Sequence, residues 1–171
     1  MTPFEVSAAL DTLTVLVDTR EQQTPALQRR LKTMKLPYIR QKLDFGDYSA
    51  KCTLDTGKEL DFSGEFAIER KMNFDELCQC YTRGRGRFER EFLRAKETGA
   101  KIYLLVENGS WEKALNGEYR SRMNPDAFVA SMTAWLARYD CQLIFCEPKV
   151  SGRMIREIVY REVKERLEND Q

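Results

Sequence analysis

The chain has 171 residues, of which 42% are apolar and 32% are charged, and its formal net charge is only +1. This length suits one domain with a single core, and the balanced charge argues against a strongly basic, nonspecific nucleic-acid binder while leaving local basic patches open. The composition predicts a chain that folds along most of its length, and we find no repeat, linker or low-complexity segment.

The sequence contains no histidine, and its five cysteines are an odd number without a C-x-x-C pair. A structural zinc site is therefore not expected, and Ser-His-Asp or Cys-His mechanisms are excluded because both need an imidazole base. No apolar run is long enough to cross a membrane and no signal peptide is apparent. We expect an intracellular protein, cytoplasmic in a bacterium or virus and nuclear in a eukaryote, whose catalysis would rest on carboxylates, amines and a metal.

The first half of the chain is expected to contain several strands and one helix. After an irregular start, residues 13–17 form an apolar, β-branched run that ends at Asp18, as a buried strand would. A helix is expected over residues 24–35, because Thr24 can cap it and Pro25 suits its first position. Further strands are expected over residues 38–43, 48–54 and 66–71, with a hairpin turn at 55–57.

The second half is expected to be richer in helices. A helix begins at Phe74 and continues through Tyr81, and the Gly-Arg stretch at 82–87 reads as a loop leading into another helix. We expect strands at 101–107 and 141–146, a short helix at 111–115, and longer helices from residue 124 and over 154–167. This alternation predicts an α/β fold with a mixed central sheet flanked by helices. The domain assignment is residues 1–150, with residues 151–171 as a C-terminal helix packed on it or extending from it.

Four acids and one lysine stand at the ends of these strands or just past them. Glu69 and Lys71 are two residues apart on one strand, so their side chains point the same way. A hard divalent cation takes oxygen ligands, and a neighbouring ammonium can hold an attacking water and offset developing negative charge. The pattern therefore indicates a metal-dependent nuclease site, and its residues are Asp18, Glu21, Asp47, Glu69 and Lys71.

A Glu-x-Lys pair alone is weak evidence, since such pairs commonly lie on a solvated strand face. Asp47 strengthens it, because it stands 22 residues before Glu69, a separation that would put the two acids on neighbouring strands. Two carboxylates on neighbouring strands repel each other at such a short distance, unless a cation lies between them or one of them has a raised pKa.

The densest basic cluster follows this strand and is rich in glycine, which lets the backbone approach a phosphate closely. A solvated basic surface is the simpler interpretation. Phosphate binding is favoured because local acids at helical spacing cannot neutralise all of these arginines. The cluster consists of Arg83, Arg85, Arg87, Arg90 and Arg94.

These residues match a family pattern. The chain resembles the nuclease domain of XPF/Hef-type structure-specific endonucleases, within the restriction-endonuclease-like fold. The family pattern consists of Gly-Asp, a variable gap, Glu-Arg-Lys, three further residues and Asp. It is present here at residues 46–47, 69–71 and 75. The family's upstream element, Val-Asp-x-Arg-Glu, is present at residues 17–21. Gly86-Arg87 is similar to the family's basic element. The resemblance covers residues 13 to 147 and every acidic position of the motif.

The resemblance implies a role for each residue. Asp47 and Glu69 would be the principal ligands of Mg²⁺ or Mn²⁺, helped by the Arg70 carbonyl and by Asp18 or Glu21, directly or through water. Lys71 would orient or deprotonate the attacking water. Arg70 is included among the catalytic residues, although we favour a bracing ion pair with Asp75 or another acid over phosphate contact. Asp75 could instead cap the next helix, approach the metal or contact DNA. The candidate DNA contacts are Arg20, Arg83, Arg85 and Arg87, with Arg87 the best candidate.

The expected function is a metal-dependent endonuclease that cuts branched, flap-like or partly single-stranded DNA in repair, recombination or mobile-element replication. Many relatives carry a helix-hairpin-helix domain, which we do not find here, so we expect a protein partner or a second copy to supply junction recognition. Relatives pair through the segment that corresponds to residues 125–146, and a homodimer is expected. The alternative is a non-catalytic DNA-binding or scaffold subunit with a nuclease fold.

Overall fold

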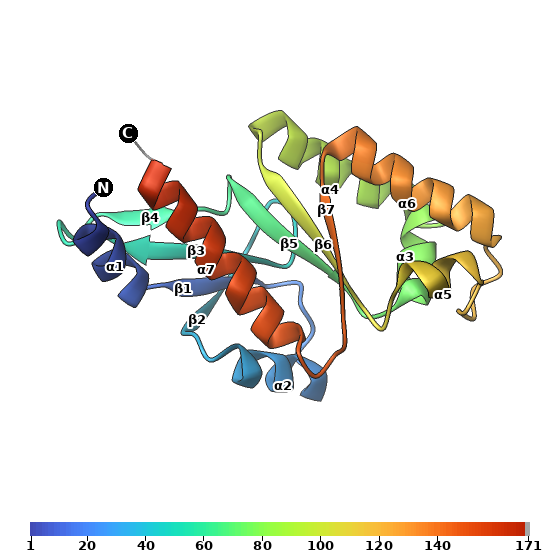
Figure 1. Ribbon diagram of the computed structural model, residues 1–171, viewed down its shortest axis with the longest axis horizontal. Helices are drawn as coiled ribbons and strands as arrows, with labels where there is room; N and C mark the ends of the chain where they lie inside the picture. Colours follow the sequence, from blue (N-terminus) through green and yellow to red (C-terminus); the bar gives the residue numbers. More distant parts are fainter. Residues whose placement is uncertain (170–171) are drawn as a thin grey trace.

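The structure is a computed structural model that describes residues 1–169, and it consists of a seven-stranded mixed sheet with helices on both faces (Figure 1). This confirms the predicted fold class. The strands are β1 (Thr14–Asp18), β2 (Tyr38–Gln41), β3 (Tyr48–Thr53), β4 (Glu59–Asp61), β5 (Phe66–Lys71), β6 (Lys101–Glu107) and β7 (Gln142–Cys146). The helices are α1 (Pro3–Asp11), α2 (Pro25–Met34), α3 (Phe74–Tyr81), α4 (Arg85–Thr98), α5 (Trp111–Leu115), α6 (Pro125–Tyr139) and α7 (Ser151–Asn169).

The order of the strands brings the expected site residues to one edge of the sheet. The order is β2-β1-β3-β5-β6-β7, with β4 forming a hairpin with β3. Strand β3 runs antiparallel to both β1 and β5, whereas β5, β6 and β7 are parallel. The carboxyl ends of β1, β5 and β6 therefore meet the amino end of β3, where Tyr48 pairs with both Val17 and Ile68.

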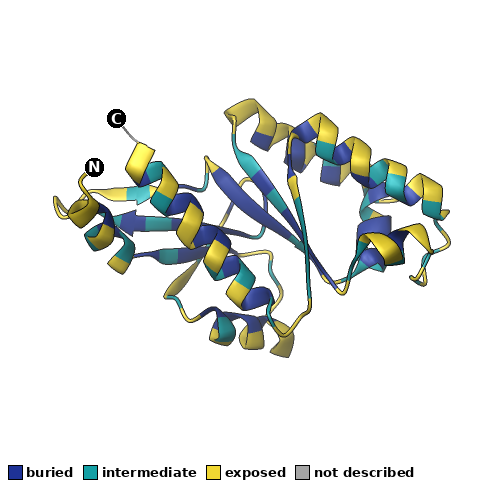
Figure 2. Cartoon of the chain, viewed as in Figure 1, coloured by how far each residue is buried: buried dark blue, intermediate teal, exposed yellow. Residues whose placement is uncertain are grey.

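Alternate residues of the central strands pack into two separate apolar clusters, as the side-chain period of a strand requires. Ile68 and Leu105 face the cluster beneath α1, α2 and α7, and Ala67 and Leu104 face the cluster beneath α3, α4 and α6. Figure 2 shows the buried central strands between these outer helices. Glu69 and Lys71 have the parity of Ala67 and belong to the α3–α4 side, whereas Arg70 belongs to the α2–α7 side.

The amino terminus differs from the expected irregular start, because residues 3–11 form α1. Thr2 and Glu5 make a reciprocal capping box, and Pro3 occupies the first turn. Val6 and Ala9 are buried in the same cluster as α7. The short helix is stabilised by its cap and by packing against residues distant in sequence.

The Gly-Arg stretch also differs from the prediction. Only residues 82–84 form a turn, because α4 already begins at Arg85 and Arg87 lies in its first turn. The turn is closed by the Gly84 N–H, which donates to the Gln79 carbonyl at 2.8 Å.

Helix α7 crosses α2 closely and covers the sheet. A side chain at Gly152 would put its Cβ 2.2 Å from the backbone oxygen of Arg30, so this crossing requires glycine. Residues 170 and 171 of the proposed C-terminal segment lie outside the described residues. Among residues 1–169, no helix combines the length and apolar character needed to cross a membrane.

Candidate active site

Asp47 is held between β1 and β5 by its own backbone. Its N–H donates to the Ile68 carbonyl and its carbonyl accepts from the Asp18 N–H, both at 2.8 Å. Gly46 lies at φ +71°, and a Cβ there would be 2.6 Å from the Cβ of Ala67. The Gly-Asp sequence therefore combines a left-handed residue, which glycine adopts without strain, with the acid that it delivers to the edge of β5.

Glu69 and Lys71 form a buried ion pair on the α3–α4 side of β5. Their side chains are 6% and 10% exposed, and the Lys71 Nζ donates to Glu69 Oε1 at 2.6 Å. The same ammonium lies 5.1 Å from the centre of the Phe88 ring. Burial alone would lower the pKa of Lys71, but the charge of Glu69, the nearby Cys80 and Asp47, and the hydrogen bond to Glu69 together outweigh burial and raise this pKa. Lys71 therefore keeps its positive charge at neutral pH.

A cavity of about 530 Å³ runs along this edge of the sheet, and we call it the catalytic cavity. One oxygen of each central acid is occupied, since Asp47 Oδ2 accepts from the Arg70 N–H at 2.8 Å and Glu69 Oε1 accepts from Lys71. Within residues 1–169, no hydrogen bond reaches Asp47 Oδ1 or Glu69 Oε2. The cavity is lined by Arg20, Glu21, Asp47, Glu69, Arg70, Lys71, Glu76, Arg87 and Glu91, among others.

The electrostatics of this cavity suit a cation. Burial raises the pKa of Asp47 well above its usual range, and the negative charges of Glu69 and Glu21 add to this effect. A divalent ion would relieve the repulsion, and two free carboxylate oxygens are the hard ligands that Mg²⁺ and Mn²⁺ take. Within the described residues, no three acid or cysteine side chains already form a complete metal cluster. Asp47 and Glu69 are the residues whose chemistry fits such an ion.

Glu21 lines the same cavity but is held by residues from the α2 side of the sheet. The buried hydroxyl of Tyr48 donates to Glu21 Oε2 at 3.0 Å and accepts from Arg30 Nη1 at 2.9 Å. Arg30 also approaches Glu21 Oε2 at 3.4 Å. These contacts leave Glu21 near the central acids with a defined orientation.

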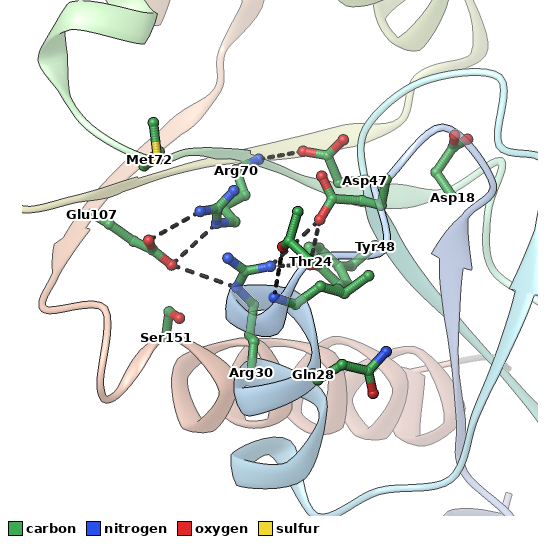
Figure 3. Close-up of polar contacts among 12 residues, drawn as sticks. Asp18, Thr24, Gln28, Arg30, Asp47, Tyr48, Arg70, Met72, Glu107 and Ser151 are labelled. Carbon is green, nitrogen blue, oxygen red and sulfur yellow. Dashed lines mark hydrogen bonds and ion pairs between the residues drawn. The ribbon is translucent and has the colours of Figure 1, made fainter.

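Arg70 points away from Glu69 and forms an ion pair, but with Glu107 rather than Asp75. Its Nε and Nη2 donate to the two oxygens of Glu107 at 3.1 Å each. Arg30 also approaches Glu107 Oε1, at 3.5 Å, so one carboxylate pairs with two guanidinium groups (Figure 3). Burial would raise the pKa of Glu107, but the hydrogen bonds and charges of the arginines lower it overall. This arrangement supports a bracing role for Arg70.

Asp18 is fully buried, and both oxygens of its carboxylate accept hydrogen bonds. Oδ1 accepts from the Arg20 backbone N–H at 2.7 Å and from its Nε at 2.8 Å, and Oδ2 accepts from the Leu43 N–H at 2.8 Å. Burial opposes the ionised form, but these bonds lower the pKa of Asp18 overall. Arg20 continues to Glu91 Oε1 at 3.1 Å. The geometry gives Asp18 the position of a loop anchor rather than that of a direct ligand.

The arginines of the basic cluster point to different places. Arg87 lines the catalytic cavity, and it also lines a second cavity of about 660 Å³ on the other side of Glu69 and Lys71. Arg83 lines this second cavity and a third hollow beyond it, but not the catalytic cavity. The Arg85 guanidinium lies 5.9 Å from the centre of the Trp135 ring, away from both cavities, and Arg94 donates to the Asp44 carbonyl at 2.9 Å.

Asp75 neither caps α3 nor lines the catalytic cavity. Asn73 is the cap, because its side chain accepts from the Glu76 N–H at 2.9 Å. The Oδ1 atom of Asp75 instead accepts from the N–H groups of Arg120 at 2.8 Å and Ser121 at 2.7 Å. Asp75 therefore anchors the segment between α5 and α6.

Sequence reasoning missed three charged groups that organise the site. Arg30 belongs to the buried stripe of α2, whose other members are Leu27, Leu31 and Met34. Glu91 belongs to the buried stripe of α4, whose other members are Phe88, Phe92 and Ala95. A charge within an apolar stripe is a signal, since such residues are buried only with partners. The third group, Glu107, ends the apolar strand β6, as Asp18 ends β1.

Comparison with known proteins identifies the class that this fold and site define. The ERCC4 domain model matches residues 17–157, so the chain belongs to the ERCC4-domain family and carries an XPF-type nuclease domain. This confirms the resemblance found in the motifs. No curated protein sequence matches the chain.

Two solved structures are similar in fold. XPF from Aeropyrum pernix superposes with a TM-score of 0.61 at 23% identity, over 87% of this chain and 61% of that chain. XPF from Aeropyrum pernix in complex with DNA superposes with a TM-score of 0.62 at 24% identity, over 90% of this chain and 66% of that chain. This chain therefore spans less than two thirds of either structure.

Proposed function

We propose that this protein is a divalent-metal-dependent endonuclease that hydrolyses phosphodiester bonds in DNA. The observation that carries the proposal is the shared cavity of Asp47, Glu69 and Lys71, in which each acid keeps one oxygen without a hydrogen-bond partner from residues 1–169. Two carboxylates and one ammonium are the groups that metal-assisted phosphodiester hydrolysis requires.

Asp47 and Glu69 would hold Mg²⁺ or Mn²⁺ through these oxygens, and Glu21 would reach the ion directly or through water. When bound, the metal polarises the phosphate and lowers the pKa of a coordinated water. Asp47 is already fixed by the Arg70 N–H, so it need not reorganise when the ion binds. Asp18 contributes indirectly by holding Arg20 and the backbone of Leu43.

Lys71 supplies the positive charge beside the reacting phosphate. Because it is buried and paired with Glu69, it acts as a proton-bearing cation that orients the water and stabilises developing negative charge, rather than as the base. Arg20 and Arg87 also line the catalytic cavity, where they would contact phosphates on either side of the bond to be cut.

The substrate we propose is branched, flap-like or partly single-stranded DNA, encountered in repair, recombination or mobile-element replication. The family and the fold shared with an XPF structure in complex with DNA support a DNA substrate.

A homodimer formed through residues 125–146 remains part of the proposal. Within residues 1–169, strand β7 pairs only with β6 and ends the sheet, so one side of its backbone has no strand partner there, and α6 exposes part of its surface. A paired second copy would cover this edge. Sedimentation of the purified chain tests this directly, and a monomer at all concentrations would overturn it.

A panel of labelled flap, fork, single-stranded and duplex DNA, each with Mg²⁺, Mn²⁺ or EDTA, tests the function. We expect cleavage of at least one branched substrate that requires metal and is lost in Asp47→Asn. Asp44→Asn is the matched control, because Asp44 is exposed in the same loop. Metal-independent binding without cleavage of any substrate would instead favour the non-catalytic subunit.

A further inference from the structure

A third hollow lies beyond the two cavities that flank Glu69 and Lys71. The second cavity continues to Gln79 and Arg83, and these two residues also line the third hollow, of about 660 Å³. Because they share lining residues, the three spaces adjoin one another, and this row of spaces, which we call the path, leads from α2 past the central acids to the segment between α5 and α6. We call the last space the arginine pocket, and its basic residues are Arg83, Arg120 and Arg122.

The arginine pocket is built by Asp75 rather than by chance proximity of surface side chains. The Asp75 carboxylate accepts from the backbone N–H groups of Arg120 and Ser121 and from the Arg120 Nε at 3.3 Å. These bonds tie a segment 45 residues away in the sequence to the first turn of α3. Figure 1 shows this segment between α5 and α6 beside α3. Asp75 thus fixes the backbone from which Arg120 and Arg122 extend.

The charge of the arginine pocket is largely uncompensated. Asp75 is the acid that lines it, and within residues 1–169 neither Arg83 nor Arg122 forms an ion pair. The Arg120 side chain pairs with Asp75 but is 90% exposed, so it remains available to a ligand. Three guanidinium groups beside one carboxylate make a site for a polyanion.

We propose that the arginine pocket binds backbone phosphates of a single-stranded DNA arm that leaves the catalytic cavity. The inference rests on the proposed function, because the path connects the pocket to the cavity where cleavage would occur. The pocket is lined by eight residues from α3, the turn that follows it and the segment between α5 and α6, which suits contact with one strand rather than with both strands of a duplex. The arginines contact phosphates, so the pocket confers preference for a strand of sufficient length rather than for a sequence.

The test compares Arg120→Gln/Arg122→Gln with Arg153→Gln/Arg161→Gln, a control that removes the same charge from exposed positions of α7. Binding of forks with a short or a long single-stranded arm is measured by fluorescence anisotropy in EDTA, over a range of salt concentrations. Arg83 is left intact because it also lines the second cavity. Thermal unfolding confirms that both variants fold.

We expect the pocket variant to bind the long-armed fork about tenfold more weakly, with a salt slope smaller by about 1.4 for two lost phosphate contacts to a single strand. The affinity of the pocket variant for the short-armed fork should match that of wild type. The control variant should match wild type in both affinity and salt slope. Equal losses in both variants, no loss in either, or the same loss when the long arm is double-stranded would overturn the proposal.

The binding assay separates this inference from the proposed nuclease activity. If wild type binds long arms through the arginine pocket but cuts no substrate with metal, the nuclease proposal fails and the pocket stands. If wild type cuts DNA but the pocket variant binds the long-armed fork as tightly as wild type does, the pocket fails and the nuclease proposal stands.

Discussion

The carboxylate of Asp47 accepts a hydrogen bond from the backbone N–H of Arg70 at 2.8 Å. This bond connects the two halves of the acidic motif, because Arg70 stands between Glu69 and Lys71 on β5. The separation of the two central acids is therefore set by backbone geometry, which is stiffer than a contact between two long side chains. An amide at position 47 can still accept this bond, so the charge of Asp47 can be removed with its anchor retained.

Asp47→Asn is expected to lower metal-dependent cleavage at least about 100-fold, because a metal ligand is lost. The same change should stabilise the metal-free protein by on the order of 1 kcal/mol, since it removes a buried charge that Glu69 repels. Cleavage kinetics and thermal unfolding in EDTA measure the two effects. Loss of stability together with retained activity would contradict this account of Asp47.

Tyr48→Phe is expected to destabilise the protein by about 1–2 kcal/mol, because Arg30 and Glu21 lose their shared hydroxyl. If Glu21 supports the metal, apparent metal affinity should also fall about 10–100-fold. Tyr103→Phe is the matched control, because the Tyr103 hydroxyl also donates to a carboxylate, that of Glu162, but outside the catalytic cavity. Equal metal titrations for the two variants would show that the Tyr48 bond does not position Glu21.

Glu107→Gln should destabilise the fold by about 3 kcal/mol at neutral pH, because Arg30 and Arg70 are left buried without their shared acid. The pKa of Glu107 is lower in the folded protein than in the unfolded chain. Its stabilisation is thus present above the unfolded pKa of about 4.3 and is lost as pH falls through the folded value. The stability difference between wild type and variant should shrink below about pH 4 in urea titrations. This account of Glu107 would be refuted if the stability difference did not depend on pH. It would also be refuted if Glu97→Gln, at an exposed position, gave the same difference.

Gly46→Ala and Gly57→Ala both place alanine at positive φ, at +71° and +80° respectively. At Gly57 no atom lies within 4 Å of an added Cβ, so Gly57→Ala should lower the free energy of unfolding by only about 1–2 kcal/mol. Gly46→Ala adds a clash with Ala67 and should lose at least about twice as much. Chemical denaturation of the two proteins provides the comparison. Equal losses of stability in the two variants would mean that β5 moves away from the added methyl group at position 46 without an energetic cost.

Several features of this protein were determined by residues close together in the sequence. Thr24 and Pro25 begin α2 as expected, the turn at 55–57 closes the β3–β4 hairpin, and alternation along β5 puts Glu69 and Lys71 on one face. Caps, turns and side-chain periods depend on neighbours within a few residues. The acidic motif was readable for the same reason, since its residues stand at strand ends that local patterns define.

Which acids remain free was decided only by the tertiary structure. Asp18 and Asp47 look alike in the sequence, yet Arg20 and Leu43 occupy both oxygens of Asp18, whereas Asp47 keeps one. Asp75 likewise binds a loop 45 residues away. Hydrogen bonds and charge pairs form between groups that the strand order brings together, and that order depends on packing across the whole chain, which no local pattern contains.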